Sequence, residues 1–319
     1  MSISVLGAGA FGTALAIALS RDGTDVTLWS RNRNDSDRMQ DSRKSGKRLP
    51  GCVLPESLSV TTDDAAFAAD ICLLAIPAQK LSGFAEQTPL GTDATLLACC
   101  KGIDQTTGLG PVATLRRARP SNTAAILTGP SFAVDIAKGM PTALVLACES
   151  ARDVETLQAK LTRPNLRLYR TTDVIGAELG GALKNVMALA AGITIGADLG
   201  DSARASVIAR GFAELTRFAK AKGAETETIQ GLSGLGDLIL TCTSDKSRNF
   251  RAGVDLGKGI SLNHETTIEG LATAPTVATE AKTLGLDLPL IQAVADVVGG
   301  HLSIASAIET LLLRPVGKE

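Results

Sequence analysis

The motif GAGAFG at positions 7–12 constrains the fold of this 319-residue chain more than any other feature. An apolar, β-branched candidate strand precedes it, and an Ala-rich candidate helix follows it. In that setting Gly7 permits a tight turn, Gly9 lets a pyrophosphate approach the backbone, and Gly12 lets helix and strand pack closely. Free N–H groups at the helix N-terminus then attract the phosphates. The alternative is a plain strand–helix turn, but this context favours dinucleotide binding.

The first half of the chain alternates short apolar runs with amphipathic stretches. Several runs are almost continuously apolar, which is typical of parallel strands buried on both faces. Helices fit between them, for example over 12–21 and 151–161. The candidate strands are 2–6, 25–29, 58–61, 70–76, 94–99, 124–128, 142–147 and 166–169. Repeated strand–helix–strand units predict an α/β fold with an N-terminal Rossmann-like doubly wound sheet.

The second half shows no strand-like run after about residue 172. Helical segments follow one another there, separated by glycines and prolines. The candidate helices are 174–195, 202–222, 236–242, 248–256, 276–283, 290–298 and 303–312. We therefore predict two domains. Residues 1–173 form an NAD(P)-binding Rossmann domain, and residues 174–319 form an all-helical C-terminal domain for substrate binding and catalysis.

Composition argues against several classes of partner. The net charge of −1 and the aromatic content of 3% provide neither a basic field nor a base-stacking surface, so we expect no nucleic acid partner. The apolar stretch 186–197 is shorter than a membrane span requires, and no integral membrane segment is expected. Small molecules are the expected partners.

The six cysteines form no CxxC pair, and three of them lie inside apolar strand-like runs. Reduced core thiols are therefore favoured over disulfides or metal ligands. With only His264 and His301, a zinc site built on histidines is not expected, so a protein acid would have to polarise a carbonyl in any redox reaction. The apolar segment 3–19 lacks the basic start of a signal peptide. These features predict a cytoplasmic protein.

The segment after the second candidate strand reads Trp29-Ser30-Arg31-Asn32-Arg33. An NAD-selective site usually has an acidic residue here that accepts from the ribose 2′-hydroxyl. This chain has none before position 35, whereas Arg31 and Arg33 could pair with a 2′-phosphate and Ser30 could donate to it. Alternatively, the arginines are merely solvated. The pattern favours NADP(H), with NAD(H) as the second option.

Lys184 is unusual because it interrupts a helical segment of small and apolar residues. If that helix is buried, desolvation lowers the pKa of the lysine toward neutrality, which suits an acid that protonates an alkoxide. Gly180 and Gly181, one turn earlier, would leave room for a ligand. A lysine that snorkels to water from the helix edge is the alternative, and the residues alone do not separate the two.

Two further segments of the second half carry polar groups. The sequence TSDKSRNFR at 243–251 could bind a phosphate through Ser247, Arg248 and Asn249, although the residues alone slightly favour an ordinary capped and charged helix N-terminus. Asp237 follows the glycine-rich sequence GLG in an apolar setting. A buried carboxylate needs a partner, and Lys184, Arg248 or a substrate hydroxyl would serve.

Taken together, these segments resemble the bacterial NAD(P)+-dependent glycerol-3-phosphate dehydrogenase family over nearly the whole chain. The motifs that carry the resemblance occur in the family order: GAGAFGTALA at 7–16, the two LP pairs within 49–55, IPAQ at 76–79, CKGI at 100–103, GPSFA at 129–133, GALKN at 181–185, GLGDLILTCTSDKSRN at 234–249 and EG at 269–270. Ser202 departs from the family, which usually has Asn there, and the segment 259–269 looks shorter than in familiar members.

The resemblance implies reduction of dihydroxyacetone phosphate to sn-glycerol 3-phosphate, the backbone of glycerophospholipids, in a cleft between the two domains. It implies that Lys184 is the catalytic acid/base for the C2 oxygen. It implies substrate contacts by Lys101, Gly129, Ser131, Lys184, Asp237, Ser247, Arg248 and Asn249. It implies cofactor contacts by Gly7, Gly9, Ala10, Phe11, Gly12, Arg31, Lys101, Ala133, Arg248, Thr267 and Glu269. By analogy the protein is a homodimer.

Two rival functions remain at this level. Another Rossmann-plus-helical dehydrogenase, of the ketopantoate or 6-phosphogluconate type, would keep GxGxxG and a helical lysine but would lack SRN behind GLGDL. A non-catalytic nucleotide-sensing protein would bind the cofactor without a functional lysine. The joint presence of Lys101, Lys184 and Arg248 argues against the second rival.

Overall fold

The computed structural model describes residues 2–262 and 268–313. The chain divides into two compact units, Met1–Glu178 and Leu179–Glu319. The division falls inside one long helix, α7 (Val174–Gly196), whereas the predicted domain boundary at 173/174 coincides with the start of that helix.

The N-terminal unit is built on one eight-stranded sheet with the strand order β3-β2-β1-β4-β5-β6-β7-β8. Its strands are β1 (Ile3–Leu6), β2 (Val26–Trp29), β3 (Leu58–Thr61), β4 (Ile71–Leu74), β5 (Thr95–Ala98), β6 (Ala124–Thr128), β7 (Thr142–Ala147) and β8 (Leu166–Thr171). Neighbouring strands are parallel, except that β7 runs antiparallel to β6. The predicted doubly wound sheet is confirmed.

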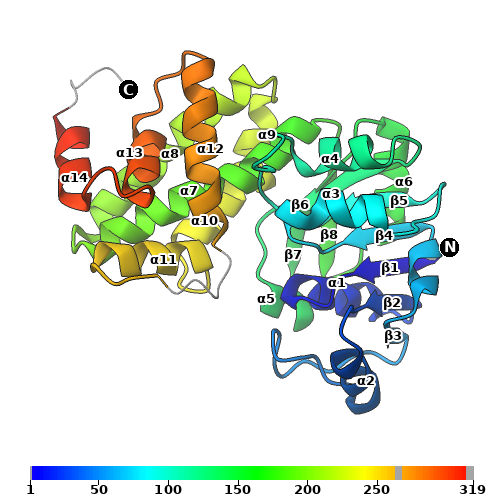
Figure 1. Ribbon diagram of the computed structural model, residues 1–319. Helices are drawn as coiled ribbons and strands as arrows, with labels where there is room; N and C mark the ends of the chain where they lie inside the picture. Colours follow the sequence, from blue (N-terminus) through cyan, green and yellow to red (C-terminus); the bar gives the residue numbers. More distant parts are fainter. Residues whose placement is uncertain (1, 263–267, 314–319) are drawn as a thin grey trace. The chain divides into compact units, whose positions relative to one another are not determined.

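The central strands are almost entirely buried because helices cover both faces of the sheet. Every residue of β1, β4 and β6 is buried. The helices of this unit are α1 (Ala10–Ser20), α2 (Arg33–Ser42), α3 (Ala78–Gln87), α4 (Pro111–Ala118), α5 (Ala133–Ala137) and α6 (Ala151–Leu161), with a 3-10 turn at Asp64–Ala68. As Figure 1 shows, α1 and α5 pack together on one face, and α3 and α4 pack together on the other.

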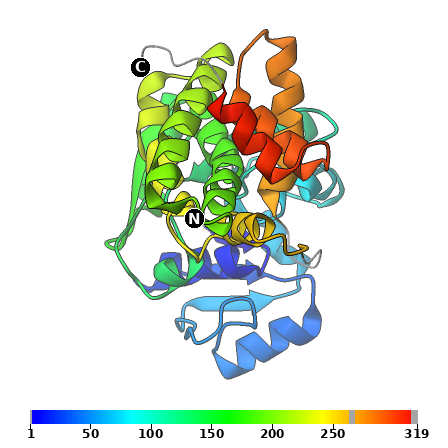
Figure 2. The same ribbon diagram turned by 90° about the vertical axis from the view of Figure 1, so that its left-hand side faces the viewer.

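All regular elements described in the C-terminal unit are helical (Figure 2), as predicted. They are α7 (Val174–Gly196), α8 (Gly200–Ala221), α9 (Thr226–Gln230), the π-helical turn η2 (Leu232–Gly236), α10 (Asp237–Cys242), α11 (Arg248–Gly257), α12 (Glu269–Thr283), α13 (Pro289–Val298) and α14 (Ile304–Leu312). The predicted helix 276–283 is only the second half of α12, which starts at Glu269 and contains Pro275.

Helix α7 is long and apolar enough to cross a membrane by length and composition alone. The apolar stretch 186–197 considered in the sequence is therefore only part of a longer segment. Because 83% of the most apolar window of α7 is buried inside the structure, α7 has the environment of a core helix.

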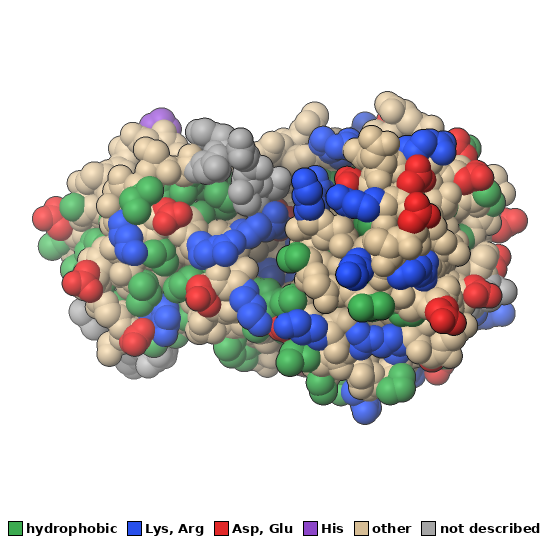
Figure 3. All heavy atoms as spheres, turned by 90° about the horizontal axis from the view of Figure 1, so that it is seen from below, with side chains coloured by type: hydrophobic (Ala, Val, Ile, Leu, Met, Phe, Trp, Pro, Cys, Tyr) green, Lys and Arg blue, Asp and Glu red, His purple; other side chains and the backbone are tan. Residues whose placement is uncertain are grey.

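The six cysteines are all buried, which confirms their predicted place in the core, and none of them is in a disulfide within the described residues. Burial raises the pKa of Cys72 and of Cys242 to about 12, which keeps both as thiols at neutral pH. On the surface, Lys and Arg side chains occur together with Asp, Glu and apolar groups on the face drawn in Figure 3. This mixture agrees with the net charge of −1.

Candidate active site

The glycine-rich turn joins β1 to α1 with the geometry that the motif predicts. Gly7 has φ +118°, and a Cβ there would lie 2.6 Å from the carbonyl oxygen of Ala75. A Cβ on Gly12 would collide with the carbonyl oxygen of Gly7 and would lie 2.8 Å from Cβ of Ala75. Gly9 differs, because nothing lies within 4 Å of a Cβ built there. The turn therefore needs two glycines for its own packing and leaves the third facing open space.

Gly9 is also the N-cap of α1 and makes no side-chain capping bond. The helix therefore begins on bare backbone beside the space above Gly9, as a phosphate site requires. Ala10 and Phe11, the first two residues of α1, are half-buried and pack against the core of the sheet. These residues fit the pyrophosphate of a dinucleotide.

Two buried polar atoms lack a hydrogen-bond partner within the described part of the chain: Nε1 of Trp29 and Oγ1 of Thr128. They belong to the last residues of β2 and β6. Ligands of doubly wound sheets bind beyond the carboxyl ends of the strands, and unsatisfied buried donors are rare away from such places. The two atoms therefore support a ligand site at this edge of the sheet.

The loop after β2 presents Arg31 to solvent, and this side chain forms no ion pair with another described residue. Ser30 is buried, and its hydroxyl accepts from the backbone N–H of Asn32 at 3.3 Å. Asn32 in turn caps α2 by accepting from the N–H of Asp35 at 3.0 Å. The loop is thus fixed by its own hydrogen bonds, while the guanidinium group of Arg31 stays accessible.

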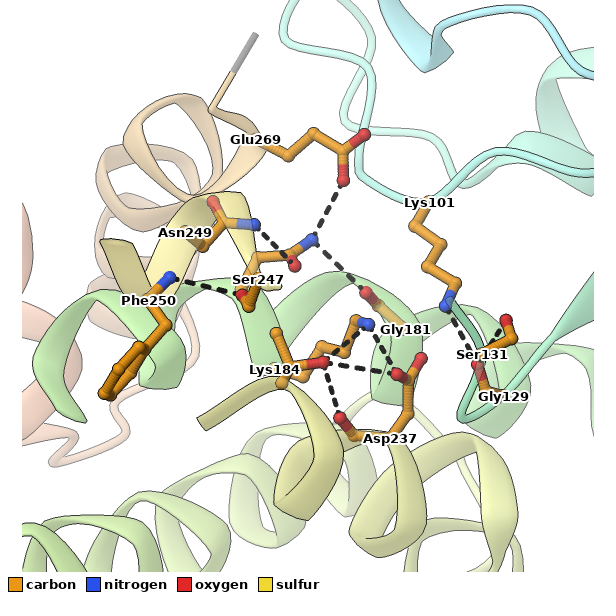
Figure 4. Close-up of polar contacts among 12 residues, drawn as sticks. Lys101, Gly129, Ser131, Gly181, Lys184, Asp237, Ser247, Asn249, Phe250 and Glu269 are labelled. Carbon is orange, nitrogen blue, oxygen red and sulfur yellow. Dashed lines mark hydrogen bonds and ion pairs between the residues drawn. The ribbon is translucent and has the colours of Figure 1, made fainter. Parts of the chain in front are cut away.

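Lys101 follows β5, and its Nζ donates to the carbonyl oxygen of Gly129 at 3.1 Å (Figure 4). Ser131 donates to the same oxygen at 3.3 Å. Gly129 has φ +126° and is packed against the backbone of Leu144, so a side chain is excluded there. Three predicted substrate residues are therefore brought together. Ala133, the first residue of α5, packs half-buried against the core.

Lys184 lies in the middle of α7 and is 7% exposed. Its Nζ lies 2.5 Å from Oδ1 of Asp237, which is fully buried, and donates to Oγ1 of Thr241 at 2.9 Å (Figure 4). The alternative of a lysine snorkelling to water is therefore wrong. Of the three partners that the sequence left open for Asp237, the structure shows the contact with Lys184, and the carboxylate stabilises the ammonium group.

The position of Asp237 depends on close backbone packing. The π-helical turn η2 ends at Gly236, and Asp237 starts α10 directly after it. A Cβ on Gly180 of α7 would lie 2.5 Å from the carbonyl oxygen of Ser233. The expectation that Gly180 leaves room for a ligand is therefore wrong, because the backbone of η2 fills that space. The glycine instead lets η2 approach α7 closely enough for Asp237 to reach Lys184.

A second polar network lies beside Lys184. Asn185 accepts from Nδ2 of Asn249 at 2.9 Å and donates to Oε2 of Glu269 at 3.1 Å. Oδ1 of Asn249 accepts from the N–H of Gly270 at 2.9 Å. This network joins α7, α11 and the start of α12. It gives Asn249 and Glu269 defined positions, and Thr267 lies outside the described residues.

Ser247 is buried and caps α11 by accepting from the N–H of Phe250 at 3.2 Å. The capped helix N-terminus considered as an alternative is therefore present. Arg248, the first residue of α11, has a half-exposed side chain, and its Nη2 lies 4.0 Å from Oε1 of Glu269. A surface ion pair of this length is weak, so the guanidinium group can still bind an anion.

Glycines allow α7 and α11 to cross at backbone contact. A Cβ on Gly192 or Gly196 of α7 would collide with carbonyl oxygens of α11, and one on Gly253 or Gly257 would collide with or crowd those of α7. This crossing holds Asn249 next to Asn185. Sequence reasoning missed Asn185 and Thr241. The available signals were a second polar residue beside Lys184 in an apolar helix and a hydroxyl four residues after Asp237.

Two family profiles match the chain. The profile described as NAD-dependent glycerol-3-phosphate dehydrogenase N-terminus matches residues 2–154. The profile described as NAD-dependent glycerol-3-phosphate dehydrogenase C-terminus matches residues 173–309. The two matches follow one another in the order of the two units.

Curated relatives match over the full length. The chain is 53% identical over 322 residues to glycerol-3-phosphate dehydrogenase (NAD(P)+) from Ruegeria sp. (strain TM1040), with 100% of both chains covered. It is 52% identical over 320 residues to the protein of the same name from Paracoccus denitrificans (strain Pd 1222), again with 100% of both covered.

Solved structures agree. The glycerol-3-phosphate dehydrogenase of Coxiella burnetii aligns with a TM-score of 0.90 and 33% identity, covering 98% of this chain and 99% of that chain. A ketopantoate reductase from Ralstonia eutropha JMP134 aligns with a TM-score of 0.61 at 18% identity, covering 94% and 98%, a likeness of fold alone. Full-length identity above one half and both profiles point the same way: the chain belongs to the NAD-dependent glycerol-3-phosphate dehydrogenase family.

Proposed function

We propose that this protein catalyses the reversible, NAD(P)H-dependent reduction of dihydroxyacetone phosphate to sn-glycerol 3-phosphate, which supplies glycerophospholipid synthesis. The observation that carries the proposal is the buried cluster of Lys184, Asp237 and Thr241 in a chain of this family. A buried ammonium group held by a carboxylate is a suitable acid for a developing alkoxide.

Lys184 gives a proton to the C2 oxygen of the substrate and takes it back in the reverse direction. A bound nicotinamide would supply the hydride that C2 accepts. The carboxylate of Asp237 holds the ammonium group in place, and the backbone carbonyl of Asp237 accepts from the hydroxyl of Thr241 at 2.6 Å. An ammonium group stabilises the alkoxide-like transition state more than the neutral carbonyl, so its contribution appears in kcat.

The remaining predicted residues divide by chemistry. Lys101 and Arg248 are cations suited to a phosphate-bearing substrate. Gly129, Ser131, Ser247 and Asn249 line the substrate site in this proposal. Of these, Asn249 uses its side-chain amide in hydrogen bonds to Asn185 and to the backbone of Gly270. We therefore propose that Asn249 acts by orienting its neighbours. Glu269 is proposed as a cofactor contact.

NAD(P) dependence follows from the family, and we further propose a preference for NADP(H). Arg31 supports this preference because it is exposed just after β2. The residues between the end of β2 and Asp35 include no acidic side chain. Asp35 itself pairs with Arg38 at 2.7 Å. The site therefore lacks the carboxylate that selects a ribose 2′-hydroxyl and offers a guanidinium group for a 2′-phosphate.

A cytoplasmic location and a homodimer are part of the same proposal. Six described cysteines that form no disulfide support the location, because disulfides are rare in reducing compartments. The dimer rests on family analogy, and light scattering of the purified protein tests it by giving the mass of one or two chains.

The test is oxidation of NADPH and NADH in the presence of dihydroxyacetone phosphate, measured for wild type and Lys184→Ala. Turnover by wild type and its loss in the variant are expected. Absence of turnover in wild type would overturn the function. Near-normal turnover in Lys184→Ala would overturn the mechanism and leave the function intact.

A further inference from the structure

Glu178 belongs to α7, and its buried carboxyl group contacts the start of α4. This carboxyl group takes no part in the chemistry proposed above. Its Oε1 accepts from the backbone N–H of Val112 at 2.6 Å. The residue as a whole is half-buried, but its neighbours enclose the carboxyl group: a Cβ on Gly110 would lie 2.6 Å from Cδ of Glu178 and would collide with Oε2. Gly110 is the N-cap of α4 and has no side chain to cap the helix.

The segment that begins at Lys101 ends at Gly110, and Val112 lies just beyond it in α4. This segment, residues 101–110, is here named the Lys101 loop. At its start Lys101 bonds to Gly129. In its middle, Gln79 of α3 donates to the carbonyl oxygen of Ile103 at 2.8 Å and accepts from the N–H of Gln105 at 3.1 Å. At its end Glu178 accepts from the N–H of Val112, and the hydroxyl of Thr114 in α4 donates to the carbonyl oxygen of Gly110 at 2.9 Å.

We propose that Glu178 is a positioning residue that anchors the end of the Lys101 loop and thereby holds Lys101 in its substrate-binding position. The proposal rests on the substrate role assigned to Lys101 above. Lys101, Gln79 and Glu178 hold the start, the middle and the end of the loop, so loss of the Glu178 contact removes one of its three attachments. Glu178 acts through the backbone of Gly110 and Val112 and does not itself touch substrate.

The charge state of Glu178 provides a readout that a purely structural cap lacks. Burial raises the pKa of Glu178 to about 7; the hydrogen bond from Val112 opposes this rise, and Glu149 adds to it. Glu149 itself pairs with Arg116 of α4. In the loop, the carboxylate of Asp104 accepts from the N–H of Thr107 at 2.8 Å. Glu178 therefore changes charge near neutral pH, and its ionised form is the stronger acceptor at a helix N-terminus.

A matched control exists elsewhere in the chain. Glu214 of α8 is 3% exposed and accepts from the N–H groups of Leu290 and Ile291 at 2.7 and 3.0 Å. It therefore caps α13, which like α4 begins with proline. Both carboxyl groups cap a proline-initiated helix, but only α4 directly follows the Lys101 loop. Glu214→Ala therefore measures the effect of losing a helix cap, that of α13, without disturbing the Lys101 loop.

The experiment measures KM for dihydroxyacetone phosphate and amide hydrogen exchange in residues 101–112. Glu178→Ala should raise KM about tenfold and speed exchange in the loop, whereas Glu214→Ala should do neither. Glu178→Gln keeps an acceptor oxygen and should rescue KM at pH 7. The difference between its pH profile and that of wild type should show a transition near pH 7. Unchanged KM and exchange in Glu178→Ala would overturn the proposal.

Two more variants keep the test decisive. If Glu178→Ala does not fold, Gly110→Ala displaces the carboxyl group while retaining it, and the same rise in KM is expected. In a double-mutant cycle with Lys101→Ala, the effects of Lys101→Ala and Glu178→Ala should not add; full additivity would contradict positioning. Unchanged KM in Lys101→Ala would instead remove the substrate role of that lysine, and hydrogen exchange alone would then decide whether Glu178 anchors the loop.

Discussion

Nζ of Lys184 lies 2.5 Å from Oδ1 of Asp237, and both residues are buried. Helix α7 supplies the cation, and α10 supplies the anion immediately after a π-helical turn. Removing charges from water is costly unless they are paired and hydrogen-bonded. The pair therefore makes the fold of this unit depend on the same groups that carry out the proposed chemistry.

This dependence separates stability from activity in a double variant. Lys184→Ala leaves the Asp237 carboxylate buried without its partner, and the loss of stability should be about 3–5 kcal/mol. Adding Asp237→Asn removes the charge and should restore most of the unfolding midpoint in urea, while kcat stays about 10²–10⁴-fold below wild type. A double variant no more stable than Lys184→Ala would show that the pair is not the source of the loss.

The phosphate-binding turn predicts opposite outcomes for two Gly→Ala substitutions. Gly12→Ala collides with Gly7 and should destabilise the protein by about 1–3 kcal/mol. Gly9→Ala meets open space and should leave the thermal midpoint of the cofactor-free protein unchanged. Its Kd for NADPH, measured by calorimetry, should rise about tenfold or more because the methyl group occupies the phosphate approach. Unaltered NADPH affinity in Gly9→Ala would argue against phosphate binding at this turn.

Arg31 should determine cofactor choice. Arg31→Asp is expected to raise KM for NADPH by about 10- to 100-fold, the loss of charged hydrogen bonds worth about 1.5–3 kcal/mol. KM for NADH should change much less. Arg152→Asp, an exposed residue of α6 with the same change in charge, is the control. Equal effects of Arg31→Asp on both cofactors would remove the argument for a 2′-phosphate contact.

The buried carboxyl group of Glu214 predicts a pH dependence of stability. Burial raises the pKa of Glu214 above its ordinary value of 4.5 in spite of two backbone hydrogen bonds. The folded state therefore holds the proton more tightly than the unfolded state does. The resulting stabilisation is complete below pH 4.5 and is lost as the pH rises through the raised pKa.

Glu214→Gln removes this dependence. Relative to the variant, wild type should lose at most about 1.4 kcal/mol of unfolding free energy per pH unit as the pH rises from about 5 through the raised pKa. Urea unfolding of both proteins at several pH values measures the difference. Curves that stay parallel over that range would mean that the folded and unfolded states bind this proton equally.

The strands of the sheet and most long helices were predictable from the sequence because their signals are local. Predicted strands 58–61, 124–128 and 142–147 match β3, β6 and β7, and predicted helix 151–161 matches α6. Apolar runs and helical periodicity act within one segment, where chain geometry fixes which face is buried. The antiparallel direction of β7 has no such local signal, since it depends on pairing with β6.

The site was predictable only in part. Lys184 is conspicuous in the sequence because an ammonium group in an apolar helix needs an explanation. Lys184 was only one of three options for the partner of Asp237, and Asn185 and Thr241 were missed, because polar pairing is decided between segments. Gly180 shows the same limit: the residue type indicated space, whereas the backbone of Ser233 occupies it.

By itself, the sequence determined a glycine turn between strand and helix, an α/β unit followed by a helical unit, and an isolated lysine in an apolar segment. Only the tertiary structure decided what that lysine meets. Lys184 and Asp237 are 53 residues apart, a separation greater than the length of any helix or strand among the described residues. Desolvation makes each of them costly alone, and contact across α7 and α10 compensates that cost. Such a contact depends on how segments pack, which local residue patterns do not encode.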